Sequence, residues 1–290
     1  MTTQTHPRYF FIIGAMKAGT TSLFKYLADH PDLCPSNRKE PKVFRDPGRA
    51  SDQRAKLQNL FTPRSTERWY FEASTAYTKY PRFTGIPSRI REAVPDARFV
   101  YLVRNPVDRT WSHYLHNLAH GRERLPFGQA VSKRPVYLDI SRYNLQLQQY
   151  YDVFPRECVL VQVFEEMIAD PTSTVRAICD FLGVDSSYQP AAKGVAFNAS
   201  TDKLAASAPM RTLTSLGMQR MIPGPLRQRL RARGTPLPRK SAVLTPESRA
   251  QVADTVRDDT EALFASLGRR IEAWDDFARA PSPARAERSR

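Results

Sequence analysis

Short apolar runs alternate with longer amphipathic segments along the first two thirds of the chain. Runs rich in β-branched and aromatic residues predict buried strands at Tyr9–Ile13, Tyr70–Ala73, Arg98–Val103 and Cys158–Phe164. Helical periodicity predicts helices at Thr20–Ala28, Ser88–Ala93, Val107–Ala119, Arg142–Val153 and Pro171–Leu182. Because strands separated by helices join through right-handed crossovers, we expect an α/β fold with a mostly parallel sheet and helices on both faces.

The pattern changes after Gly183. Asp185–Thr201 is loop-like, and Ala205–Arg233 predicts one or two basic helices that are interrupted at Pro223–Pro225. Helical periodicity resumes at Thr245–Leu267, after a Thr-Pro-Glu start signal. This last helix is expected to belong to the same domain as the strands.

The length and composition fit one folded domain. The chain has 290 residues, of which 41% are hydrophobic and 25% charged, so a wholly disordered or fibrous protein is excluded. We expect a single domain over residues 1–278, with a variable region at 184–245. Residues 279–290 are polar and proline-containing, which predicts a disordered tail.

The charge balance points to anionic partners. Lys and Arg number 44 against 29 Asp and Glu, a net charge of +15, which favours nucleotides, phosphorylated or sulfated acceptors, nucleic acid or an anionic membrane surface. The apolar stretch Tyr9–Met16 is too short to span a bilayer and lacks the flanks of a secretory signal, so we expect a cytoplasmic protein. Cys34, Cys158 and Cys179 are scattered, which argues against a zinc site or a disulfide framework.

The stretch Gly14–Ser22 follows the first predicted strand and opens the first predicted helix. Backbone N–H groups at such a turn form a cradle for phosphate. Gly14 and Gly19 keep the G-x-x-x-x-G spacing of a Walker A loop, but Thr20 occupies the position where a nucleoside triphosphatase needs lysine. The lysine comes earlier, at Lys17, where its ammonium would lie beside the bridging oxygen of a bound group. The alternative is a generic strand-to-helix turn with a surface lysine.

A second candidate for anion binding follows the third predicted strand. Arg104 stands at the carboxyl end of that strand, where ligands of open α/β sheets bind, and Ser112 lies about two turns into the next helix. A guanidinium and a hydroxyl in these positions can bind a second phosphate. Alternatively, Arg104 pairs with a carboxylate such as Asp108, and Ser112 caps the helix or faces solvent. Two phosphate-binding elements favour a bisphosphorylated nucleotide.

Three segments together resemble sulfotransferases that use 3′-phosphoadenosine 5′-phosphosulfate (PAPS), in particular the heparan-sulfate-type and bacterial branch. They are GAMKAGTTSL at 14–23, KEPKVF at 39–44 and LVRNPVDRTWSHY at 102–114. The resemblance implies a P-loop-like sheet and sulfuryl transfer to an acceptor oxygen or nitrogen. It also implies that the 5′-phosphosulfate is held by Lys17, Ala18, Gly19, Thr20, Thr21 and Ser22, and the 3′-phosphate by Arg104 and Ser112.

The resemblance also implies catalytic roles. Glu40 matches the glutamate that serves as base in the glycan-type branch; a surface ion pair with a neighbouring lysine is the alternative. Lys17 is expected to neutralise charge on the departing oxygen. Because a sulfuryl group carries less charge than a terminal phosphoryl group and no Walker B-like acidic motif is present, we expect metal-independent, in-line transfer. His113 and His116 are competing bases, and Glu72 is a further candidate contact to the acceptor.

The implied acceptor is a hydroxyl-bearing carbohydrate, glycolipid or secondary metabolite, with an amine as the alternative. The basic cluster Arg227–Lys240 is interpreted as solvated surface, although an anionic acceptor or a membrane surface would also suit it. Two rival functions stay open. A P-loop nucleotide kinase is disfavoured by Thr20 at the lysine position. A basic nucleic-acid-binding protein is disfavoured because no helix-turn-helix, zinc or RNP-like signature is present, so we expect no nucleic-acid partner.

Overall fold

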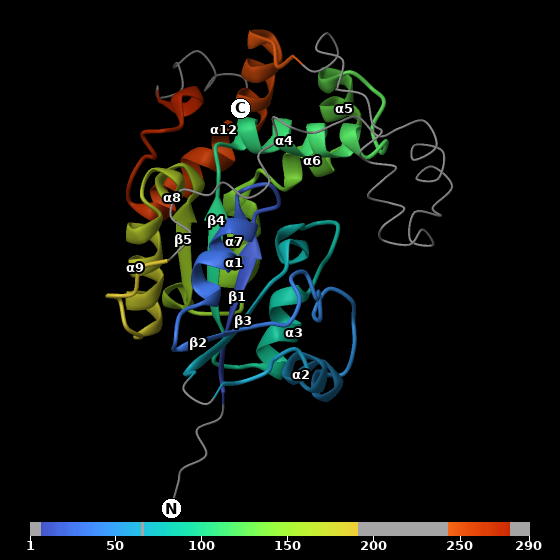
Figure 1. Cartoon of the computed structure of the whole chain (residues 1–290). Helices are drawn as coiled ribbons and strands as arrows, with labels where there is room; N and C mark the ends of the chain where they lie inside the picture. The colour runs from blue at the N-terminus through green and yellow to red at the C-terminus, as the bar shows by residue number, and fades with distance from the viewer. Residues whose placement is uncertain (1–6, 65–66, 191–242, 279–290) are drawn as a thin grey trace, which may run out of the picture.

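The computed structural model describes residues 7–64, 67–190 and 243–278 (Figure 1). This part is built around a five-stranded sheet in the order β2-β3-β1-β4-β5, in which all neighbouring strands run parallel. The strands are β1 (Arg8–Gly14), β2 (Leu33–Pro35), β3 (Trp69–Ala73), β4 (Arg98–Val103) and β5 (Val159–Val163). The predicted α/β fold is confirmed, and the carboxyl ends of the strands meet at one edge of the sheet.

Helices connect the strands. They are α1 (Thr20–Ala28), α2 (Ala50–Gln58), α3 (Ile86–Ala93), α4 (Pro106–Ala119), α5 (Phe127–Lys133), α6 (Val136–Asp139), α7 (Tyr143–Tyr151), α8 (Phe164–Ala169), α9 (Pro171–Leu182) and α12 (Pro246–Leu267). Short 3-10 helices are η1 (Thr75–Thr78), η2 (Arg156–Cys158) and η6 (Asp275–Phe277). In Figure 1 the sheet lies in the middle of the molecule, with α4 and α12 above it and α2 and α3 below.

Strand side chains alternate between two apolar faces. On one face Phe10 stacks on Phe71 with ring centroids 4.8 Å apart, and Phe24 of α1 packs against Phe71. On the other face Phe11 stacks on Phe99, which Tyr150 of α7 meets edge-on. Because α1 and α7 cover opposite faces, the sheet lies between two helical layers, as predicted.

Most predicted boundaries agree closely with the structure, but two elements are shorter and several are added. The helix predicted at Arg142–Val153 extends only over Tyr143–Tyr151. The strand predicted at Cys158–Phe164 is shorter at both ends, because Cys158 belongs to η2 and Phe164 begins α8. Strand β2 and helices α2, α5, α6 and α8 are additions. β2 has three residues and ends in proline, and α2 buries only Gln53 and Leu57, so neither produces a periodic apolar pattern.

Helix α12, near the C-terminal end of the described residues, packs against α4 and α7. Thr245 caps it, as the start signal predicted. Asp259 accepts hydrogen bonds from the N–H groups of Asn144 and Leu145 at the start of α7, at 3.0 and 2.9 Å. The last helix therefore supports the half of the sheet edge that carries β4.

Some predictions lie outside the described residues. They concern the loop beyond residue 190, the basic helices at 205–233 with their break at 223–225, the cluster at 227–240 and the tail at 279–290.

Candidate active site

The loop between β1 and α1 has the form of an anion cradle. Gly19 precedes α1 with a φ of 87°, and a Cβ there would lie 2.6 Å from the ring of Phe164, so this position requires glycine. Thr20, Thr21 and Ser22 form the first helical turn, which contains no acidic residue. The N–H groups at the start of a helix carry partial positive charge and favour an anion.

Several residues that were predicted to bind the phosphosulfate have buried side chains. Ala18, Thr20 and Ser22 are 0%, 5% and 3% exposed. Ala18 can therefore contribute to binding only through its backbone. The hydroxyl of Thr20 accepts a hydrogen bond from Lys39 Nζ at 3.2 Å, a contact that sequence reasoning did not anticipate.

Lys39 joins this loop to the KEPKVF segment. Its Nζ lies 3.4 Å from Glu40 Oε1, so the ion pair considered from the sequence is present. Glu40 Oε1 also accepts hydrogen bonds from the N–H of Thr75 at 3.2 Å and from its hydroxyl at 3.0 Å. The N–H of Glu40 donates to the carbonyl of Ala73 at the end of β3, at 2.8 Å. Glu40 is thereby held next to the start of α1, with 30% of its side chain exposed.

Backbone strain is concentrated at this site. Among the described residues, the non-glycine residues with positive φ are Lys17 at 74°, Glu40 at 61° and Lys42 at 58°. Each such conformation costs about 1–2 kcal/mol and persists only where the surroundings enforce it. Strain of this kind clusters at ligand-binding and catalytic sites, which supports a functional role for these segments.

Arg104 reaches the loop from the carboxyl end of β4. Its Nη1 donates to the carbonyl of Lys17 at 3.3 Å, and its guanidinium lies 4.8 Å from the ring centroid of Phe164. Arg104 Nε is buried without a hydrogen-bond partner in the described parts of the chain, which leaves a donor for a ligand. The alternative pairing with Asp108 is wrong, because Asp108 binds Arg249 at 2.8 Å.

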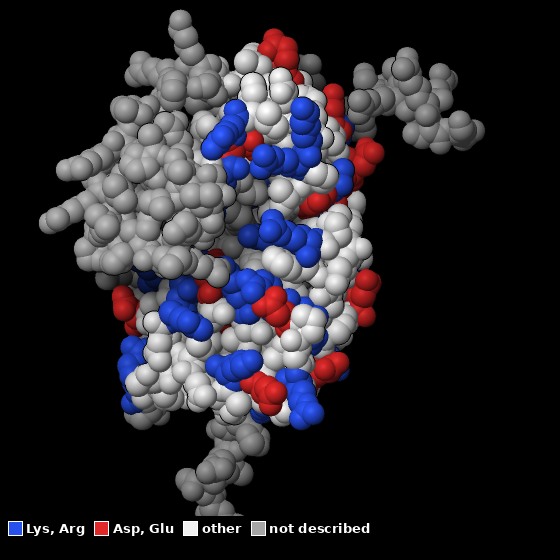
Figure 2. All heavy atoms as spheres, turned by 90° about the vertical axis from the view of Figure 1, so that its right-hand side faces the viewer, with Lys and Arg blue, Asp and Glu red and all other residues white. Residues whose placement is uncertain are grey.

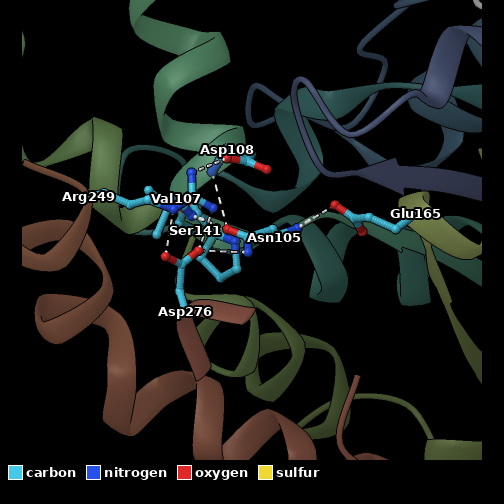
Figure 3. Close-up of polar contacts among 8 residues, drawn as sticks. Asn105, Val107, Asp108, Ser141, Glu165, Arg249 and Asp276 are labelled. Carbon is cyan, nitrogen blue, oxygen red and sulfur yellow. Dashed lines mark hydrogen bonds and ion pairs between the residues drawn. The ribbon is translucent and has the colours of Figure 1, made fainter. Parts of the chain in front are cut away.

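The turn between Arg104 and α4 is closed by a cap (Figure 3). Asn105 Oδ1 accepts hydrogen bonds from the N–H groups of Val107 at 2.9 Å and Asp108 at 3.3 Å. Such a cap satisfies donors that the first helical turn leaves open and stabilises the helix by about 1 kcal/mol. The conformation of the chain next to Arg104 is therefore well determined.

C-terminal residues hold this cap in place. Asn105 Nδ2 donates to Asp276 Oδ2 at 2.9 Å, and its N–H donates to Glu165 Oε1 at 3.0 Å. Arg249 of α12 bridges Asp276 and Asp108, at 2.7 and 2.8 Å. Figure 3 shows these side chains converging on the start of α4 from α8, α12 and η6. Elements that are distant in the sequence thus fix the orientation of Arg104.

Helix α4 places two further polar residues behind the loop. Ser112 is 3% exposed, and Arg109 is fully buried. Arg109 donates to the hydroxyl of Ser141 at 2.6 Å and to the carbonyl of Met16 at 3.5 Å, and no carboxylate pairs with it among the described residues. Burial lowers its pKa to about 10, so it stays charged at neutral pH. Sequence reasoning missed this residue, although it lies within the RNPVDR segment.

His113 of α4 is a poor candidate for a base. Burial, and to a smaller extent the positive charges of Arg109 and Lys79, lower the pKa of His113 to about 2. An imidazole with so low a pKa is a weak proton acceptor. His116 packs its ring against His120, with centroids 4.2 Å apart. The low pKa therefore argues against His113 as the base.

Glu72 does not face the site. It is fully buried in β3 and points to the sheet face that Tyr77 and Tyr150 cover, so the expected contact with an acceptor is wrong. Burial raises its pKa from 4.5 to about 7, and the hydroxyls of Tyr77 and Ser74 only partly oppose that effect. Because side chains alternate along a strand, Glu72 faces the layer opposite to its neighbours Phe71 and Ala73, and helices cover both layers.

We expect Glu72→Gln to stabilise the protein in a pH-dependent way. The folded state binds a proton at Glu72 more tightly than the unfolded chain, so stability falls as the pH rises from 4.5 to about 7 and then levels off. At about pH 8 the variant should gain up to about 3 kcal/mol in the free energy of unfolding, and below about pH 4.5 nothing. Urea unfolding across this range measures the difference, and parallel pH profiles would contradict the assignment.

Two features are absent from the described residues. No group of three or more His, Cys, Asp or Glu side chains in residues 7–64, 67–190 and 243–278 could hold a metal ion. None of the helices in these ranges combines the length and the apolar character that a bilayer crossing requires.

Known proteins resemble this chain in sequence and in structure. A model of the sulfotransferase family matches residues 48–189. Human bifunctional heparan sulfate N-deacetylase/N-sulfotransferase 2 is 26% identical over 196 residues, which cover 60% of this chain and 22% of that protein. Mouse heparan sulfate glucosamine 3-O-sulfotransferase 6 is 29% identical over 185 residues, which cover 60% of this chain and 51% of that protein.

A crystal structure extends the likeness to almost the whole chain. A sulfotransferase from Alicyclobacillus acidocaldarius is 28% identical, with a TM-score of 0.66 and coverage of 93% of this chain and 99% of that one. The two curated relatives are longer proteins, of which this chain spans between about a fifth and a half. The resemblance inferred from the three motifs is confirmed. In its parallel sheet, its modified phosphate loop and its sequence, the chain is similar to proteins of the sulfotransferase family.

Proposed function

We propose that the protein transfers a sulfuryl group from PAPS to a hydroxyl group of a carbohydrate, glycolipid or secondary metabolite. The observation that carries the proposal is the convergence of the loop, Glu40 and Arg104. Lys39 links Glu40 to Thr20, and Arg104 hydrogen-bonds the carbonyl of Lys17. A carboxylate beside an anion cradle is the arrangement that sulfuryl transfer to a hydroxyl needs.

The residues present fit a nucleotide that carries phosphate at two positions. The loop offers the N–H groups of Gly19, Thr20 and Thr21 and the ammonium of Lys17 for the 5′-phosphosulfate, whereas the N–H of Ser22 donates to the carbonyl of Gly19 at 2.9 Å. Arg104 offers a buried Nε donor, and Ser112 a hydroxyl, for the 3′-phosphate. PAPS, when bound, supplies the activated sulfuryl group. Arg109 adds a buried positive charge behind the loop, which raises the affinity for any anion there.

Glu40 would receive the acceptor proton. Its Oε1 is occupied by the two hydrogen bonds from Thr75 and the contact with Lys39, which orient the carboxylate. Its Oε2 forms no hydrogen bond with the described residues, so it can accept the proton of an acceptor hydroxyl. Lys17 would neutralise the charge that develops on the departing oxygen as the sulfur–oxygen bond breaks.

The named relatives support both oxygen and nitrogen acceptors. One is named as an N-sulfotransferase and the other as a 3-O-sulfotransferase of heparan sulfate. A hydroxyl acceptor suits Glu40, because a hydroxyl must lose its proton during transfer. An amine is the second candidate.

Calorimetric titration tests the donor. The protein should bind adenosine 3′,5′-bisphosphate, the product that PAPS leaves, more tightly than ATP with Mg²⁺. Transfer of radiolabelled sulfate from PAPS into fractions of a cell extract then tests the reaction. Tighter binding of ATP, with hydrolysis or phosphoryl transfer, would indicate a kinase instead.

We expect Arg104→Ala to raise the KM for PAPS by roughly tenfold to a hundredfold while kcat changes little. A charge-assisted hydrogen bond to phosphate contributes about 1.5–3 kcal/mol, and a contact to the 3′-phosphate persists through the reaction. Steady-state kinetics with varied PAPS measures the split. Arg176→Ala, on the exposed side of α9, is the control for a lost surface charge. An unchanged KM would overturn the 3′-phosphate assignment.

We also propose a cytoplasmic location. Cys34 and Cys179 are buried, Cys158 is half-buried, and all three thiols are free. Free thiols are typical of a reducing compartment. Fractionation of cells that express the full-length protein tests this proposal.

A further inference from the structure

A basic pocket lies beside the proposed catalytic residues. It has a volume of about 450 Å³, within the range of sites for small molecules. Its walls come from the chain after η1, from α4, from the α4–α5 loop and from the region of α6. Six lining residues are cationic and none is Asp or Glu: Lys42, Arg45, Lys79, Arg82, Arg122 and Arg134.

Most of this positive charge is unbalanced. Arg45 pairs with Asp46, and Arg134 pairs with Glu123 at 3.2 Å. The other four cations form no ion pair with the described residues. Figure 2, which views the molecule from the right-hand side of Figure 1, shows Lys and Arg side chains gathered around a hollow. Like charges so close together repel one another, so a bound anion would reduce this electrostatic repulsion.

The pocket adjoins the reacting positions. Met16, directly before Lys17, lines it, and so does Lys42, two residues after Glu40. His113, which also lines it, has a pKa lowered in part by Lys79 and Lys17. A group in the pocket would therefore be near both the sulfuryl donor and the base.

We propose that this pocket binds an oxyanion group of the acceptor, a phosphate, sulfate or carboxylate, and so places the accepting hydroxyl at Glu40. The inference deepens the proposed function and rests on it. The acceptor would then be an acidic molecule rather than a neutral alcohol or phenol.

Lys79 is the residue that distinguishes an anion site from an ordinary basic surface. Burial, and to a smaller extent the charges of Lys42 and Arg82, lower its pKa to about 8, although Glu40 opposes this. Its ammonium has no hydrogen bond or ion pair with the described residues. A half-buried ammonium without a counter-charge, among several other cations, is electrostatically unfavourable, so its presence suggests a ligand.

Binding of pyrophosphate to protein that is saturated with adenosine 3′,5′-bisphosphate tests the inference. The nucleotide fills the phosphate positions of the donor site, so that calorimetry reports on the remaining anion site. We expect Lys79→Met to weaken pyrophosphate binding about tenfold or more, as the loss of a charged hydrogen bond predicts. Lys56→Met removes the same charge from an exposed position on α2 that does not line the basic pocket, and it should change pyrophosphate affinity less than about twofold.

A stability measurement accompanies the binding test. Lys79→Met keeps the approximate volume of the side chain and removes a half-buried charge that other cations surround, so the ligand-free variant should melt at a higher temperature than the wild type. A gain in stability with a loss of anion binding supports the inference. A loss of stability would show that the ammonium is needed by the fold and would overturn it.

The outcomes separate the two proposals. If the nucleotide binds but pyrophosphate does not, the pocket is no anion site and the proposed transfer stands. The same conclusion follows if Lys79→Met and Lys56→Met weaken pyrophosphate binding equally. If the nucleotide itself fails to bind, the proposed donor is wrong and the inference falls with it.

Discussion

Lys17→Ala should reduce kcat roughly a hundredfold to a thousandfold while the protein still folds and binds adenosine 3′,5′-bisphosphate. Lys17 is placed by a left-handed backbone conformation in the middle of the loop, with its carbonyl held by Arg104. Its ammonium would act on charge that develops only as the sulfur–oxygen bond breaks, so its loss affects the transition state more than the ground state. Single-turnover kinetics with PAPS measures the effect.

Helix α1, which follows the loop, provides a matched control. Lys25→Ala removes an exposed ammonium from the last turn of α1 and should leave kcat within about twofold of the wild type. A near-normal kcat for Lys17→Ala would contradict its role at the leaving oxygen. An equal loss in both variants would indicate a general effect of net charge.

Glu40→Gln should reduce transfer to a hydroxyl acceptor roughly a hundredfold to ten-thousandfold, the range that general base catalysis contributes. The amide has the shape of the carboxylate, and its oxygen can still accept the hydrogen bonds from Thr75. It cannot take a proton. Binding of adenosine 3′,5′-bisphosphate, measured by calorimetry, should be unchanged.

The same exchange at an exposed position controls for the lost negative charge. Glu92→Gln on α3 lies away from the loop and should transfer sulfate at the normal rate. Full activity of Glu40→Gln would place the base elsewhere, with His116 the next candidate because His113 is a weak base. Loss of nucleotide binding would instead mean that Glu40 positions the loop through Lys39.

The strands and most helices were predictable because the spacing of apolar residues within each segment shows which side chains are buried. β4 and α9 have the predicted boundaries, and each has a strong period of its own. The phosphate loop was predictable for a related reason. A strand, a glycine pair and a helix start are adjacent in the chain, so the position of the loop can be predicted locally. Its contacts with Arg104, Arg109 and Phe164 come from distant residues.

Other features depend on residues that are far apart in sequence. Burial of Glu72 follows from its register against Phe11. The low pKa of His113 follows mainly from burial, to which the charges of Arg109, Lys79 and Lys17 add. The ion pair of Asp108 with Arg249 joins positions 141 residues apart, which no local pattern reveals.

The sequence by itself determined the fold class, the phosphate loop and the resemblance to sulfotransferases, because these depend on side-chain periodicity and on motifs of a few neighbouring residues. Only the tertiary structure decided which charges share a space. The basic pocket brings together cations from several segments, and Coulomb energy depends on their distance in space rather than along the chain.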